Sequence, residues 1–97
     1  MFVILTSKPG QFRTELTEGL TPREAWDYLF HGQAKAHFVI AELGTATKIR
    51  IVDETPPVRV NEIPCKFLEK FETVDAARAQ LQGLVRAGRV DTALVRH

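Results

Sequence analysis

The segment from His37 to Asp53 constrains the fold more than any other part of the chain. It reads as two β-strands joined by a short turn at residues 44–46, since both arms are rich in apolar and β-branched residues. In the second arm, Ile49 and Ile51 alternate with cationic residues, which indicates one dry and one wet side. We therefore predict an antiparallel pair that is covered on one face.

A helix is predicted before this pair, from Thr21 to Gly32. Thr21 suits the N-cap, Pro22 suits the first helical position, and Glu24 completes a capping box. Apolar residues then recur at helical spacing as far as Phe30, and Gly32 is placed to end the helix. The side chains expected to face the sheet are Ala25, Trp26, Leu29 and Phe30.

A second helix is predicted to begin after Thr73, close to the end of the sequence. Thr73 is a suitable N-cap, Asp75 lies in the first turn, and the following positions are rich in alanine. Gly88 is placed to end this helix. Its buried stripe is expected to contain Val74, Ala77, Leu81, Leu84 and Val85.

Strands at Phe2–Thr6 and Thr92–His97 complete the expected elements, in the order β, α, β, β, α, β. This order is that of a ferredoxin-like α+β sandwich, with two helices on one face of an antiparallel sheet. Phe12–Leu16 and Val58–Phe71 would be additional strand or loop segments. Alternatively, Phe12–Leu16 forms a hairpin with the first strand. Whether Lys66–Phe71 is a strand or a helical turn stays open.

The composition fits one small domain, residues 1–97. Thirteen basic residues are interspersed with twelve acidic ones, so no basic surface for nucleic acid is expected. The single cysteine, Cys65, excludes an internal disulfide and favours the cytoplasm. The apolar run Phe2–Leu5 is too short to span a membrane.

No catalytic constellation can be named from the sequence. His31, His37 and His97 lack the spacing of a metal-binding motif, and Cys65 has no histidine near it in sequence. We therefore predict no catalytic residues, no metal site and no cofactor.

The leading functional hypothesis is a small non-catalytic interaction domain, either a homodimer or an accessory subunit of a larger enzyme. It depends on an irregular, proline-interrupted stretch with more apolar residues than a surface loop usually carries. The expected contact residues are Val58, Val60, Ile63, Phe67, Leu68 and Phe71. Internal packing of these residues is the alternative.

A second hypothesis belongs to a different functional class. The chain would be a small enzyme or a ligand-binding regulatory domain, with a pocket between sheet and helices. The polar residues expected in that pocket are His31, His37 and Asp53.

Overall fold

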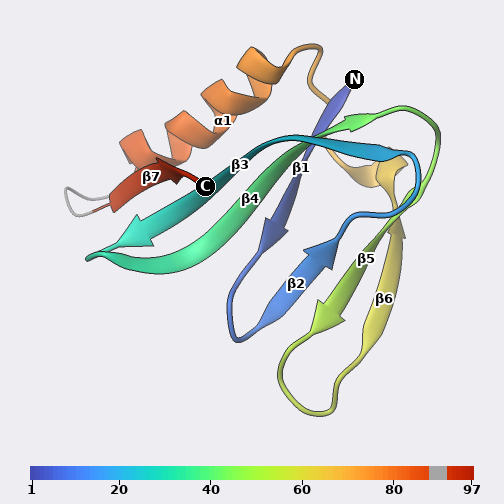
Figure 1. The fold of residues 1–97 in the computed structure, drawn as a ribbon, viewed down its shortest axis with the longest axis horizontal. Coiled ribbons are helices and arrows are strands. Elements are labelled where there is room, and N and C mark those ends of the chain that lie inside the picture. Colours follow the sequence, from blue (N-terminus) through green and yellow to red (C-terminus); the bar gives the residue numbers. More distant parts are fainter. Residues whose placement is uncertain (88–91) are drawn as a thin grey trace.

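The computed structural model describes residues 1–87 and 92–97, which form two antiparallel sheets, one α-helix and a short 3₁₀ turn (Figure 1). The four-stranded sheet has the order β1 (Phe2–Ser7), β4 (Gln33–Leu43), β3 (Leu20–Phe30) and β7 (Thr92–Arg96). The three-stranded sheet has the order β2 (Phe12–Glu15), β5 (Lys48–Asp53) and β6 (Val60–Pro64). The 3₁₀ turn η1 (Cys65–Phe67) follows β6, and the helix is α1 (Val74–Ala87).

Apolar side chains on both faces of the four-stranded sheet organise the protein into three layers. On one face, Phe38 and Ile40 of β4 pack against Ala77 and Leu81 of α1. On the other face, a second cluster of buried side chains lies against the three-stranded sheet and η1; its members are Val3, Leu5, Leu20, Ala41, Ile49 and Cys65. Successive side chains of a strand point to opposite faces of the sheet, so β1 and β4 supply side chains to both cores.

The predicted ferredoxin-like fold is wrong, because residues 20–30 form strand β3 and not a helix. Trp26, Tyr28 and Phe30 fall at alternate positions, and such aromatic residues favour strands. Strand β3 pairs with β4 along almost its whole length, so tertiary pairing overrides the local capping signal. Among the described residues α1 is therefore the single α-helix, on one face of the four-stranded sheet.

The turn between β3 and β4 explains the glycine that was expected to end a helix. His31 and Gly32 have φ angles of 51° and 76°, and Phe30 pairs directly with Gln33. Two consecutive residues with positive φ match the twist of a two-residue hairpin. Gly32 thus lies in a hairpin turn and does not end a helix. His31 adopts a left-handed conformation, in which histidine is enriched among residues other than glycine.

The predicted pairing within His37–Asp53 is also wrong, although both of its arms are strands. Strand β4 pairs with β1 and β3, whereas β5 pairs with β2 and β6. The chain between β4 and β5 passes from one sheet to the other beside the chain between β2 and β3, and the Gly44 amide donates to the Gly19 carbonyl at 2.9 Å. Strands that switch sheets at such a corner replace the predicted hairpin.

Other local predictions are confirmed by the structure. Strands form near Phe2–Thr6 and Phe12–Leu16 and at the end of the chain, although β2 pairs with β5 and meets β1 only through a bridge between Lys8 and Phe12. Ile49 of β5 is buried between exposed cationic residues. The 3₁₀ turn occupies the start of the segment that the sequence left open.

The helix after Thr73 forms as predicted, with the Thr73 hydroxyl accepting a hydrogen bond from the Ala76 amide at 3.0 Å. Ala77 and Leu81 are buried as expected, whereas Leu84 is 43% exposed. Gly88, the predicted helix end, lies outside the described residues. No helix in the described part of the chain is long and apolar enough to span a bilayer.

Candidate functional site

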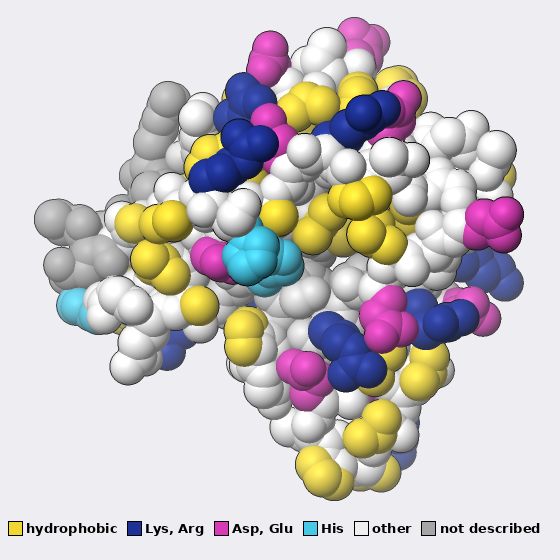
Figure 2. Space-filling view, in the orientation of Figure 1, with side chains coloured by type: hydrophobic (Ala, Val, Ile, Leu, Met, Phe, Trp, Pro, Cys, Tyr) yellow, Lys and Arg dark blue, Asp and Glu magenta, His cyan; other side chains and the backbone are white. Residues whose placement is uncertain are grey.

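Three polar side chains meet on the face of the four-stranded sheet that points away from α1. Asp27 of β3 lies directly opposite His37 of β4, and His97 follows the last residue of β7. Alternation along β3 sends Trp26 and Tyr28 toward the helix and Asp27 to the opposite side. Histidine and acidic side chains lie together on this face (Figure 2). We call these three residues the Asp27 cluster.

The Asp27 carboxylate connects the two imidazole rings. Its Oδ1 lies 2.7 Å from Nδ1 of His37, and its Oδ2 lies 3.1 Å from Nδ1 of His97. The ring centroids are 4.9 Å apart, with planes inclined by 76°. The hydrogen bond from His37 holds the pKa of Asp27 below its ordinary value; partial burial opposes this effect, and the His97 contact adds to it.

The cluster combines a set of groups suited to a metal ion. One carboxylate oxygen and two imidazole nitrogens lie within 4.8 Å of one another. The side chains of Asp27 and His37 are 28% and 29% exposed, and that of His97 is 64% exposed, so the cluster is reachable from solvent. Sequence reasoning missed it because the residues lie far apart in sequence and only the strand pairings bring them together.

The structure separates the residues of the predicted pocket. His37 belongs to the Asp27 cluster, His31 lies in the β3–β4 turn, and Asp53 ends β5 in the other sheet, where it pairs with Phe12. A cavity of about 430 Å³ lies on the helix side of the four-stranded sheet, lined by Tyr28 and Phe38 among others. A second cavity, of about 380 Å³, is lined by residues between β4 and β5, by Met1 and by the start of η1. None of the three predicted residues lines either cavity.

The predicted contact residues divide into two groups. Val58, Val60 and Phe67 are 66%, 57% and 72% exposed. Ile63 and Leu68 pack against the core between the sheets, and Phe71 packs against the core under α1. Phe71 also bonds through its backbone to Phe2 in both directions, at 2.7 and 2.8 Å. Internal packing thus accounts for half of the predicted surface, and the exposed residues lie along β6 and its two flanks.

Strand β6 is an edge strand whose outer backbone groups face away from β5. The Asp53 amide bonds to the Arg59 carbonyl and the Cys65 amide to the Thr47 carbonyl, each at 2.9 Å. Hydrogen bonding in an antiparallel ladder alternates, so the amides and carbonyls of Val60 and Glu62 point to the open edge. Pro64 occupies the next outward position, where its missing N–H removes no bond to β5.

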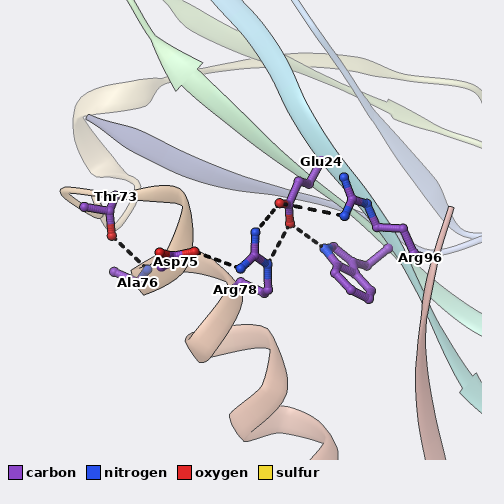
Figure 3. A network of polar contacts seen from close by, with 7 residues as sticks. Glu24, Thr73, Asp75, Ala76, Arg78 and Arg96 are labelled. Carbon is purple, nitrogen blue, oxygen red and sulfur yellow. Dashed lines mark hydrogen bonds and ion pairs between the residues drawn. The ribbon is translucent and has the colours of Figure 1, made fainter.

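A second charged network lies on the other face of the four-stranded sheet (Figure 3). Glu24 of β3 accepts hydrogen bonds from the Arg78 guanidinium of α1 and, at 3.1 Å, from the Trp26 indole, and Arg96 of β7 lies 3.9 Å away. The Arg78 hydrogen bonds hold the pKa of Glu24 below its ordinary value against the effect of burial. Every group in this network is engaged in joining α1 to β3 and β7, so we assign it a structural role.

The surroundings of the single cysteine also indicate a structural role. Cys65 is 1% exposed and belongs to the core between the two sheets. Burial raises the pKa of its thiol, while the charge of Lys70 acts weakly in the opposite direction. A buried thiol with a raised pKa is a poor nucleophile.

Comparison with known proteins adds no family to this description. No protein-family model, no curated protein and no solved structure matches the chain. The functional argument therefore depends on the geometry of the chain itself.

Proposed function

We propose that this chain is a non-catalytic interaction domain that forms a homodimer through the open edge of β6. The observation that carries the proposal is the outer edge of β6, which no other described strand pairs with and which three exposed apolar side chains flank, Val58, Val60 and Phe67. Edge strands that offer free backbone groups pair readily with a further strand, and exposed apolar side chains add surface to bury. Hydrophobic side chains also gather at the tip of the lower lobe, where the β5–β6 hairpin ends (Figure 2).

A second copy of the chain fits this edge without placing like charges opposite each other. In an antiparallel pairing about Asn61, Val60 of one copy lies opposite Glu62 of the other, and the outward amides and carbonyls of both residues are satisfied. A formal net charge of +1 adds little repulsion between the copies. Because Pro64 limits the paired length, we expect weak association that depends on concentration. We place the dimer in the cytoplasm, because a single buried cysteine suits a reducing compartment.

Sedimentation velocity over a range of protein concentrations tests the dimer. We expect the weight-average mass to rise toward that of two chains with increasing concentration. Val60→Glu should weaken dimerisation at least tenfold, because it places like charges opposite each other at both Val60–Glu62 positions of the pairing, and about tenfold corresponds to 1.4 kcal/mol. Glu62→Pro should act similarly, because it removes an outward N–H and leaves the bonds to β5 in place.

The matched control is Ala93→Glu, which introduces the same charge at an exposed position of the edge strand β7 of the other sheet, opposite the uncharged Leu29. This variant should dimerise as the parent chain does. A chain that stays monomeric at the highest concentration, or an Ala93→Glu variant that dimerises as weakly as Val60→Glu, would refute the proposal. Far-UV circular dichroism establishes that each variant is folded.

A further inference from the structure

We infer that the Asp27 cluster is a binding site for one divalent transition-metal ion, held by a carboxylate oxygen of Asp27 and one imidazole nitrogen from each of His37 and His97. The cluster lies on the four-stranded sheet, whereas β6 is an edge of the three-stranded sheet. The inference is thus independent of the proposed dimer.

The backbone places the three ligands before any ion arrives. Asp27 and His37 are direct cross-strand partners, and the strand pairing fixes their separation. The His97 amide donates to the Ala25 carbonyl at 2.8 Å, which anchors the third residue beside β3. Ligands on neighbouring strands are held more firmly than ligands on loops.

The geometry needs little adjustment to accept an ion. Bonds from zinc to histidine nitrogen and carboxylate oxygen measure about 2.0–2.2 Å, which places the ligand atoms of a tetrahedral site roughly 3.3 Å apart. The existing contacts of 2.7 and 3.1 Å, which the two carboxylate oxygens make separately, are slightly shorter than this, and one ligand atom from each of the three residues lies within 4.8 Å of the others. Small rotations of the side chains therefore exchange two hydrogen bonds for metal bonds, and any proton on a coordinating nitrogen is released to water.

The donor set indicates the class of ion. Imidazole nitrogen suits zinc, copper, nickel and iron, whereas magnesium and calcium prefer sites made of oxygen ligands. The thiol of Cys65 is buried between the two sheets and is not part of the cluster. Three protein ligands leave coordination positions for water, and the exposure of His97 gives an ion access.

Calorimetric titration of the full chain with Zn²⁺ tests the inference. We expect saturable binding of one ion per chain. His37→Asn and His97→Asn each keep an N–H donor near Asp27 but remove the imidazole, and Asp27→Asn removes the carboxylate. Each should weaken binding at least tenfold, since even the loss of a residue that only supports a ligand costs about 10–100-fold.

His31→Asn is the matched control, because it removes a histidine outside the cluster at a positive φ angle that asparagine tolerates. It should leave the Zn²⁺ affinity unchanged. His97 is exposed, so His97→Asn keeps the test decisive even if a change at His37 disturbs folding. Absence of saturable binding, one ion per two chains, an unchanged affinity in His97→Asn, or an equal loss in His31→Asn would overturn the site. Co²⁺ provides a second measurement: the inference predicts visible d–d absorption without a thiolate charge-transfer band, and such a band would contradict it.

Discussion

Glu24 ties three elements of the protein together through one carboxylate. It contacts Arg78 of α1, Arg96 of β7 and the indole of Trp26 on its own strand. Its side chain is only 9% exposed, so its charge depends on these partners. The sequence interpretation placed the same residue in a capping box with Thr21. That prediction is wrong, because Glu24 lies in strand β3 and not at the start of a helix. The helix that Glu24 contacts, through Arg78, lies more than fifty positions further along the chain.

We predict that Glu24→Gln lowers the stability of the protein in a manner that depends on pH. The folded-state pKa of Glu24 is lowered from its ordinary 4.5, chiefly by the Arg78 hydrogen bonds. The stabilisation is therefore fully present above about pH 4.5 and is lost as the pH falls through the lower pKa of the folded state. Urea denaturation of parent and variant should show a clear difference near neutral pH that shrinks steadily in acid.

Glu42→Gln is the control for this prediction. Glu42 also pairs with an arginine, Arg23, but its side chain is 39% exposed. Exposed ion pairs contribute little to stability, so this variant should unfold close to the parent at neutral pH. Equal losses in the two variants, or a Glu24→Gln effect that does not change with pH, would contradict the role given to Glu24.

At the scale of elements, the corner between the two sheets depends on Gly19. Its φ angle is 96°, and a Cβ atom there would lie 2.7 Å from the Thr45 hydroxyl oxygen. The corner carries further bonds across it: the Thr47 hydroxyl donates to the Glu18 carbonyl at 2.9 Å, and the Thr17 hydroxyl donates to the Lys48 carbonyl. Glycine at position 19 thus allows two chain segments to pass side by side between the sheets.

We predict opposite effects of the same substitution at two glycines. Gly19→Ala should destabilise the protein by at least about 1–2 kcal/mol, the cost of a left-handed conformation for a residue with a Cβ atom. Gly83→Ala should stabilise it by roughly 0.5–1 kcal/mol, because Gly83 lies within α1 and nothing lies near its added Cβ. Chemical denaturation of both variants measures the two signs. A neutral Gly19→Ala would show that the corner is not sterically constrained.

The elements show where sequence reasoning succeeds and where it fails. The Thr73 cap and the alanine-rich helix after it were predictable, because their stabilising contacts are local. Residues 20–32 carry signals for two structures. The capping signal and helical spacing predict a helix, whereas the alternation of Trp26, Tyr28 and Phe30 predicts a strand, and only pairing with β4 decides in favour of the strand. The Asp27 cluster was unpredictable for the same reason. Its members meet through strand pairings that no local pattern encodes.

At the scale of the whole molecule, the two cores share strands β1 and β4 of the four-stranded sheet. Val3 and Leu5 of β1 lie in the core between the sheets, whereas Phe2 and Ile4 pack toward α1. Because the two sets alternate along one strand, we expect the loss of either core to disturb the geometry of the other. Small domains built in this way unfold as one cooperative unit.

We therefore predict that a cavity under the helix exposes the cysteine on the far side of the sheet. Leu81→Ala should destabilise the protein by about 2–5 kcal/mol, because Leu81 is 1% exposed, and Leu84→Ala should cost far less at a 43% exposed position of the same helix. Cys65 lies in the opposite core, so its labelling by a thiol reagent reports opening there. If unfolding is cooperative, Leu81→Ala should raise the rate of Cys65 labelling by the same factor by which it raises the equilibrium constant of unfolding. Leu84→Ala should leave the labelling rate nearly unchanged. If the rate of Cys65 labelling is unchanged in Leu81→Ala while circular dichroism records the loss of stability, the layers unfold separately and the shared strands do not couple them.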